Sequence, residues 1–304
     1  MIKSILITGG TGLIGHELIK YYIENTEFNI YQVLRQEINQ NFFLNSNKIN
    51  NIILDFNDYS FTSKLPNKID SIVHLAQSVN YRNFPQYAND IFNINLRSTF
   101  QLLEYARNSN CRNFFYASSG SVYDNSLQGN LPLSEKSYIK PNPKDFYTAS
   151  KIAVENIINP YYEFMNIVVG RIFFPYGIRQ KRNTFMPSII EKIFNFQEVT
   201  LNGDKGIVFN PTPVEFIAKC IFQLLENNNN GIYNIASPRE ISLFEYSNIV
   251  SKILNKKVSF NIKDETNPQD YSVNVDKLFK SLDIFYEDKL DSYIERYKNE
   301  FLKK

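Results

Sequence analysis

A tyrosine and a lysine stand four residues apart in the run Tyr147-Thr148-Ala149-Ser150-Lys151. On a helix this spacing, about one turn, puts the phenol and the ammonium on the same face. A cation beside a phenol stabilises the phenolate, so we expect the pKa of Tyr147 to fall below its ordinary value of about 10. Such a tyrosine can exchange a proton with a hydroxyl or a carbonyl. Alone, the spacing fits a surface pair equally well, because the chain holds 20 tyrosines.

A serine is a candidate partner for this pair. Ser119 comes just after the apolar run 113–117, which predicts a buried strand. Its hydroxyl is placed to hydrogen-bond and polarise a reacting oxygen. The alternative is a serine that satisfies backbone groups at the end of a strand.

The first fifteen residues supply the element around which such a site would be built. Ile5-Leu6-Ile7 predicts a buried parallel strand, and the apolar spacing that follows predicts a helix over about 12–25. Between them, glycines permit a sharp turn, close approach of a pyrophosphate and tight helix–strand packing. The helix N-terminus then faces the phosphates. We therefore predict a dinucleotide site, against the alternative of a turn without a ligand; the residues expected to contact the dinucleotide are Gly9, Thr11, Gly12, Leu13, Ile14 and Gly15.

Strands and helices alternate up to residue 177. The pattern predicts strands at 29–34, 51–54, 69–75, 113–117 and 166–172, with helices at 88–109 and 145–163. This alternation indicates an α/β fold with a Rossmann-like, doubly wound parallel sheet. Ligands of such sheets bind outside the carboxyl ends of the strands, where all the motifs above fall.

Beyond residue 177 the alternation loosens. We predict helices near 184–196, 213–227, 242–254, 277–282 and 290–302, with strands at 198–201 and 231–235. We expect residues 1–177 plus about 206–235 to form the dinucleotide-binding domain. Residues from about 178 to 205 and from 236 to 304 would form a smaller C-terminal α/β lobe that binds substrate.

The composition excludes several classes of protein. The 304 residues carry a net charge of +2, with 43% hydrophobic residues, which gives no argument for a nucleic-acid or membrane partner. Cys111 and Cys220 form no CxxC pair, and His16 and His74 are the only histidines, so we expect no disulfide and no metal site. No signal peptide and no apolar run of ~20 residues is present, so we expect a soluble cytoplasmic protein.

Three motifs carry a family resemblance: TGGTGLIG at 8–15, SSGSVY at 118–123 and YTASK at 147–151. The chain resembles the extended short-chain dehydrogenase/reductase family, whose members are mostly nucleotide-sugar epimerases, 4,6-dehydratases and keto-sugar reductases. The resemblance implies catalytic roles for Ser119, Tyr147 and Lys151. Tyr147 would exchange the hydroxyl proton, Lys151 would also hold the nicotinamide ribose, and Ser119 would orient the substrate oxygen.

The resemblance extends to further positions, each of which is also compatible with an ordinary residue at a sheet edge. Asp55 and Phe56 match the adenine-contacting position, Leu75 and Ala76 match the pair beside the cofactor, and Asn95 matches a helix residue near the active site. Arg171 and Tyr176-Gly177 match the segment that leads to the substrate lobe. The residues expected to bind substrate are Ser119, Ser121, Tyr147 and Arg179.

Two departures from the family pattern bear on the reaction. Arg35 stands where NAD-specific members carry an acid, and an arginine favours a 2′-phosphate, so we expect NADP(H) over NAD(H). The alternative is a solvated arginine with NAD held by its other contacts. Gly120-Ser121 replaces the Asp-Glu pair of the dehydratases, so we expect the chain not to catalyse 4,6-dehydration.

The substrate lobe departs as well. Phe174 and Phe209 replace an asparagine and an arginine of the family, and Val214-Glu215-Phe216 replaces a Val-Asp-Asp motif. Either another cation holds a substrate diphosphate, or the substrate is not a nucleotide sugar. The candidate cations are Arg179, Lys181, Arg182, Lys205 and Arg239.

The leading expectation is an NAD(P)-dependent oxidoreductase that reduces a 4-keto nucleotide sugar, since NADPH is the usual reducing pool. The first alternative is a nucleotide-sugar 4-epimerase with tightly bound NAD. The second is a protein that senses a dinucleotide without catalysis, although both Tyr147 and Lys151 are present. By resemblance we also expect a homodimer formed through the helices at 88–109 and 145–163.

Overall fold

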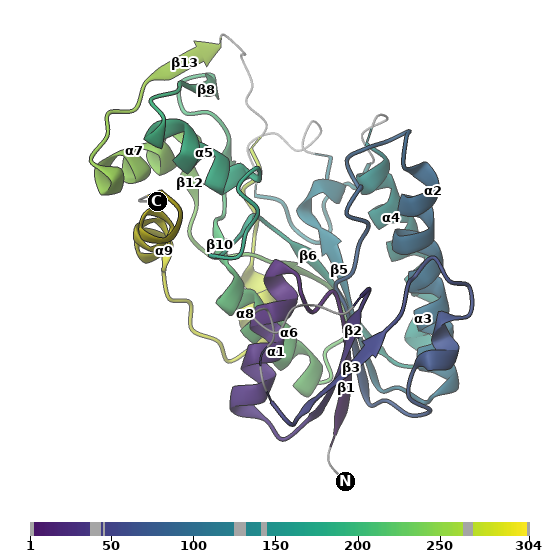
Figure 1. The fold of residues 1–304 in the computed structure, drawn as a ribbon. Coiled ribbons are helices and arrows are strands. Elements are labelled where there is room, and N and C mark those ends of the chain that lie inside the picture. The colour runs from purple at the N-terminus through teal and green to yellow at the C-terminus, as the bar shows by residue number, and fades with distance from the viewer. Residues whose placement is uncertain are drawn as a thin grey trace.

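A seven-stranded parallel sheet forms the centre of the molecule (Figure 1). The computed structural model describes residues 3–36, 44, 46–124, 132–140, 145–263 and 270–302. The strand order is β11-β6-β5-β4-β1-β2-β3, so the direction of winding reverses between β1 and β4. A reversal of this kind opens a crevice at the carboxyl ends of the strands. The strands are β1 (Ser4–Thr8), β2 (Asn29–Leu34), β3 (Ile49–Ile53), β4 (Ser71–His74), β5 (Asn113–Ser119), β6 (Asn166–Ile172) and β11 (Gly231–Ile235).

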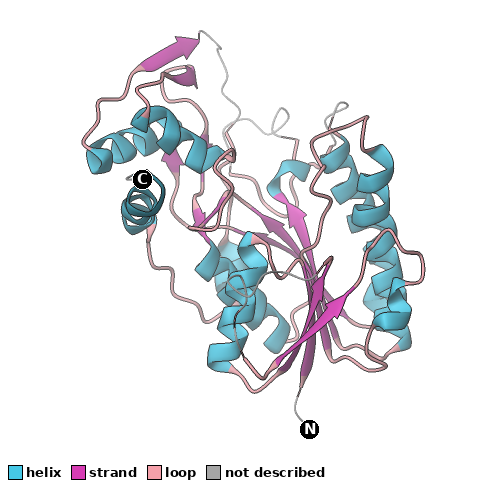
Figure 2. Cartoon of the chain, in the orientation of Figure 1, coloured by secondary structure: helices cyan, strands magenta, loops and turns pink. Residues whose placement is uncertain are grey.

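Helices cover both faces of the sheet (Figure 2). Alternate residues of β1 serve the two faces: Ile5 and Ile7 pack in one core, and Leu6 packs in the other. The first core contains α1 (Leu13–Asn25), α6 (Val214–Glu226) and α8 (Asp276–Ser281). The second contains η2 (Phe61–Lys64), α3 (Ser98–Asn108), α4 (Phe146–Ile158) and η6 (Asn159–Glu163), and α3 continues α2 (Ala88–Ile91) and the π-helical stretch η3 (Phe92–Arg97).

A third core forms the C-terminal lobe beside the carboxyl end of the sheet (Figure 1). It is built on the helices α5 (Phe185–Phe194), α7 (Leu243–Leu254) and α9 (Leu290–Tyr297), the last continued by η7 (Lys298–Leu302). Ser242 and Glu245 form a capping box that fixes the start of α7. Three two-stranded sheets complete this region: β7 (Pro175–Tyr176) with β10 (Thr212–Pro213), β8 (Val199–Asn202) with β13 (Phe260–Lys263), and β9 (Val208–Phe209) with β12 (Ile241–Ser242).

The predicted fold class is confirmed, and the predicted bounds of β2, β6 and β11 match the structure. The helix predicted over 88–109 is instead divided into α2, η3 and α3. The sequence analysis did not predict β13, because this strand has four residues, too few for a clear alternation of apolar and polar side chains, and its side chains are largely exposed.

The structure also bears on how the chain is divided. β11 joins the central sheet, and Leu278 of α8 packs in the core that contains α1, although we assigned 236–304 to the smaller lobe. The proposed division into two domains therefore stays a prediction. No helix in the described ranges is long and apolar enough to cross a membrane.

Candidate active site

The turn between β1 and α1 is tight enough to require glycine. Gly9 has a φ of +71°, and a Cβ on Gly9 would lie 2.8 Å from the backbone nitrogen of Ala76. A Cβ on Gly15 would lie 2.3 Å from the carbonyl oxygen of Gly9. No side chain caps α1 at Gly12, and its first turn holds no acidic residue. The N-terminal N–H groups of α1 are therefore left for a ligand, as a pyrophosphate site requires.

A chain of hydrogen bonds between buried groups supports the glycine turn. The Thr8 hydroxyl lies 2.7 Å from Nδ1 of His74 and accepts from the backbone N–H of Ala76, and Nε2 of His74 lies 2.9 Å from the Thr99 hydroxyl. Burial lowers the pKa of His74 to about 3, so the imidazole is neutral. β1, β4 and α3 are thereby held in register beneath the glycines.

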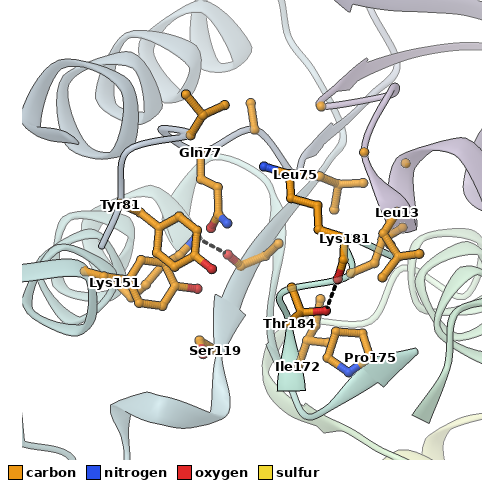
Figure 3. Close-up of a pocket in the computed structure, with 18 of the residues that line it drawn as sticks. Leu13, Leu75, Gln77, Tyr81, Ser119, Lys151, Ile172, Pro175, Lys181 and Thr184 are labelled. Carbon is orange, nitrogen blue, oxygen red and sulfur yellow. Dashed lines mark hydrogen bonds between the residues drawn. The ribbon is translucent and has the colours of Figure 1, made fainter. Parts of the chain in front are cut away.

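One cavity of about 1120 Å³ runs from the glycine turn to the C-terminal lobe (Figure 3). This volume is large enough for a dinucleotide-sized ligand. Most of the predicted site residues line it: Gly9, Thr11, Gly12, Leu13, Ile14, Gly15, Arg35, Asp55, Phe56, Leu75, Ala76, Ser119, Ser121, Tyr147 and Lys151.

The predicted catalytic side chains meet on one wall of this cavity. Asp145 caps α4 by accepting the backbone N–H groups of Tyr147 and Thr148, which fixes the first turn of the helix. Ser119 and Tyr147 line the same cavity, and the Ser119 hydroxyl acts to lower the pKa of the Tyr147 phenol. Lys151 is buried one turn further along α4, and its ammonium donates to the carbonyl oxygen of Ala117 at 2.7 Å.

We predicted that the pKa of Tyr147 lies below its ordinary value. This prediction is wrong when only the groups of the protein itself act on the phenol. Burial raises the pKa of Tyr147 to about 12, opposed by the Ser119 hydroxyl and by the charge of Arg82. Burial also lowers the pKa of Lys151 to about 7. The physical reason is that both groups are desolvated, while the Lys151 ammonium is anchored on Ala117 and lies 5.6 Å from the centre of the Tyr147 ring.

Two predicted residues lie outside the cavity wall. Asn95 is buried in η3, where it accepts from the backbone N–H of Ser78 at 2.9 Å and donates to the Ser150 hydroxyl at 3.1 Å. It therefore links the loop after β4 to α4. Arg179 lines a second, smaller cavity of about 160 Å³, together with Glu17 and Glu215. The structure thus brings neither residue to the main cavity.

Sequence reasoning missed several residues of the main cavity. The Tyr81 ring lies 4.9 Å from the Tyr147 ring, and the Arg82 guanidinium lies 5.2 Å from the Tyr81 ring. One feature of the sequence indicated these two residues, namely that they come shortly after a predicted strand. Ligands of this fold bind beyond the carboxyl ends of the strands. Lys181 was one of five candidate cations, and only the structure places it on the cavity wall.

The glycine turn and the parallel sheet are those of a dinucleotide-binding fold, and Ser119, Tyr147 and Lys151 line the same cavity. Residues 5–236 match the model of the NAD dependent epimerase/dehydratase family. The chain belongs to this family, of the extended short-chain dehydrogenase/reductase type, and is an NAD-dependent enzyme.

Relatives with known names span several reactions. A dTDP-D-glucose 4,6-dehydratase of Dictyostelium discoideum is 26% identical over 277 residues, which cover 84% of this chain and 62% of that protein's length. A putative UDP-glucose 4-epimerase of Methanocaldococcus jannaschii is 30% identical over 260 residues, which cover 81% of each chain.

Solved structures share the whole fold. The UDP-N-acetylglucosamine 4-epimerase from Methanobrevibacter ruminantium M1 superposes with a TM-score of 0.84 at 22% identity and covers 99% of both chains. The UDP-glucuronic acid 4-epimerase from Bacillus cereus, in complex with UDP-glucuronic acid and NAD, gives 0.82 at 22% identity and covers 97% of this chain and 99% of its own. At this identity the likeness concerns the fold alone.

Proposed function

We propose that this enzyme is a nucleotide-sugar 4-epimerase that keeps NAD bound. The observation that carries the proposal is that Ser119, Tyr147 and Lys151 line the same cavity as the glycine turn. The structural relatives described above that bind UDP-sugars are 4-epimerases. They favour this alternative over the keto-sugar reductase that we first expected.

The carboxylates of the cavity argue against a dehydratase. Elimination of water requires an acid that protonates the leaving hydroxyl. Gly120 and Ser121 follow Ser119 where that acid would stand, and the described part of the wall holds two carboxylates, Asp55 and Asp145. Asp145 is engaged as the cap of α4, and Asp55 lies beyond β3 near the predicted adenine end.

NAD is the cofactor that the proposal requires. The family is NAD-dependent, and the Bacillus cereus enzyme binds NAD, so the preference for NADP that we expected from Arg35 is not supported. Gly9, Gly12 and the N-terminus of α1 would hold the pyrophosphate, and Lys151 would hold the nicotinamide ribose. When bound, the nicotinamide supplies a hydride acceptor and donor.

The protein's own residues then handle the proton. Tyr147 takes the proton of the substrate 4-hydroxyl and later returns it, while Ser119 donates a hydrogen bond to the same oxygen. Because burial raises the pKa of Tyr147 to about 12, a positive charge near the phenol promotes this step. Arg82 supplies such a charge, whereas the Lys151 ammonium lies 5.6 Å from the centre of the Tyr147 ring.

The test is turnover without added coenzyme. The purified protein is incubated with UDP-glucose, UDP-N-acetylglucosamine or UDP-glucuronic acid, and the two 4-epimers are separated by chromatography. We expect both epimers at equilibrium and NAD released from the denatured enzyme. Stoichiometric loss of NADPH absorbance with a 4-keto sugar nucleotide, and no epimer, would instead identify the reductase.

A further inference from the structure

The wall that the C-terminal lobe adds to the main cavity is nearly free of charge. Three aromatic residues form its centre: the Phe174 ring lies 5.5 Å from the Phe185 ring and 5.9 Å from the Tyr271 ring. Pro175, Gln180, Thr184 and Met186 add neutral surface. Among the described residues of this wall, Lys181 is the one cation.

The four other basic residues considered for this lobe are paired with a carboxylate, line the second cavity or lie outside the described wall of the main cavity. Arg182 pairs with Glu191 at 2.6 Å, and Arg239 pairs with Asp288. Arg179 lines the second cavity, and Lys205 is exposed and absent from the described wall of the main cavity. An anion bound on this side of the cavity therefore has Lys181 as its available lobe-borne cation.

The backbone at Lys181 is fixed. Its carbonyl oxygen accepts from the backbone N–H of Thr184 at 3.0 Å and from the Thr184 hydroxyl at 2.6 Å. The preceding residue is tied as well, because the Gln180 side chain donates to the carbonyl oxygen of Pro175 at 2.9 Å. The base of the side chain is thus held before any ligand binds.

From this base the Lys181 side chain extends across the cavity toward Leu75, beside Leu13 at the start of α1 (Figure 3). No ion pair joins Lys181 to another described residue. The N-terminus of α1 carries partial positive charge and faces the same space. Two positive groups on opposite walls of one cavity repel each other unless an anion lies between them.

We propose that Lys181 binds a diphosphate and joins the C-terminal lobe to the dinucleotide domain through it. The diphosphate belongs either to the bound dinucleotide or to the nucleotide sugar, and this second source rests on the proposed function. Either way, Lys181 supplies the positive charge that is missing where Phe209 stands in place of the family's arginine.

The test compares three variants of the whole enzyme. Lys181→Gln removes the charge, Lys181→Arg keeps it, and Lys257→Gln is the matched control, since Lys257 is exposed on the same lobe and is not among the residues of the cavity wall. Dissociation constants are measured for NADH by fluorescence and for UDP and uridine by calorimetry. Loss of one charged hydrogen bond weakens binding about tenfold or more.

The outcomes separate the two sources. UDP affinity reduced about tenfold in Lys181→Gln, with uridine and NADH unchanged and Lys181→Arg near wild type, assigns the contact to the nucleotide sugar. The same loss confined to NADH assigns it to the dinucleotide. The proposal is overturned if Lys181→Gln matches Lys257→Gln with every probe, or if the wild type binds neither NADH nor UDP. Since binding is measured without turnover, a wild type that binds UDP through Lys181 but epimerises no sugar contradicts the proposed function alone.

Discussion

Tyr147 and Lys151 show how burial changes the chemistry that a spacing predicts. The pair was expected to act through direct charge stabilisation, yet the Lys151 ammonium is held by the Ala117 carbonyl oxygen. The pKa of the phenol is raised to about 12 and that of the ammonium is lowered to about 7. Without a ligand, the phenol is therefore protonated at neutral pH. A positive charge nearby lowers the pKa of the phenol and so favours the phenolate, which is the form that acts as a base.

Removal of the Tyr147 hydroxyl is the direct test of this role. We expect Tyr147→Phe to lower kcat by about 10²–10⁴-fold while NADH affinity stays near wild type, because proton transfer is lost and the ring still packs. The control is Tyr81→Phe, which removes the hydroxyl of the neighbouring cavity-wall ring. Epimerase activity and NADH fluorescence are measured on both proteins. Equal activity of the two variants would remove Tyr147 from the mechanism.

Arg82 offers a second test at this scale. Its charge lowers the pKa of Tyr147, so Arg82→Ala should raise that pKa and move the rising limb of the pH–rate profile to higher pH. Arg82 is exposed, so screening keeps the loss of activity at pH 8 to about two- to threefold. Arg82→Lys, which retains the charge, should keep the wild-type profile. An unshifted profile in Arg82→Ala would show that this charge does not act on the phenol.

At the scale of elements, α4 is held to the sheet by an ion pair that sequence reasoning did not predict. Arg171 of β6 donates to both carboxylate oxygens of Glu155, at 2.6 and 3.1 Å, and both side chains are buried. The Ser118 hydroxyl donates to the same carboxylate at 2.5 Å. The charge of Glu155 opposes the fall in the pKa of Lys151. The pair thus positions α4 and favours the charged form of the lysine.

The energy of this pair is measurable by a double-mutant cycle. Arg171→Leu leaves a buried, unpaired carboxylate and should lower the free energy of unfolding by about 3–5 kcal/mol. Replacing both Glu155 and Arg171 by leucine should cost less than the sum of the single changes. Urea denaturation of the four proteins provides the values. Additive losses would mean that the two charges do not interact.

The buried His74, which joins β1 to β4, makes the free energy of unfolding depend on pH. Its pKa is lowered from 6.5 to about 3, so between these values the unfolded chain binds a proton that the folded protein does not. The free energy of unfolding therefore falls as the pH drops from about 6.5 toward 3, by at most ~1.4 kcal/mol per pH unit from this group. His74→Gln should be less stable at pH 8 by about 1–3 kcal/mol but should show a shallower decline below pH 6. Parallel curves for the two proteins in urea titrations would contradict this.

The sequence predicted those features of the fold and the site that depend on residues close to one another in the chain. The glycine turn, the strand cores and the Tyr147–Lys151 spacing each follow from residues within one or two turns of one another. The positions of Arg179 and Lys181 could not be predicted this way, although only Gln180 separates them. One lines the small cavity and the other the main cavity, because the tight loop before α5 turns between them.

At the scale of the whole molecule, the helical stretch from α2 to α3 lies on one flank of the central sheet (Figure 1), and two of its aromatic side chains are exposed. Phe92 is 49% exposed and Phe100 is 47% exposed. Both belong to one of the two stretches through which we predicted a homodimer. Exposed aromatic side chains on this helical stretch fit burial against a second copy of the chain, since homodimer interfaces are rich in such residues.

A single charge on this helical stretch tests the homodimer. Phe100→Glu would bury a carboxylate in the predicted interface, so we expect a dimeric wild type to become monomeric or to dissociate at least tenfold more readily. Phe285→Glu is the matched control, because Phe285 is 83% exposed and lies in the segment between α8 and α9, outside this helical stretch. Light scattering coupled to size-exclusion chromatography gives the mass of each protein, and circular dichroism confirms the fold. A wild type that is monomeric at micromolar concentration, or a Phe100→Glu dimer as stable as the control, would show that the second copy does not bind here. The main cavity lies at the carboxyl end of the sheet and its described wall comes from a single chain, so a monomeric variant should keep the epimerase activity proposed above.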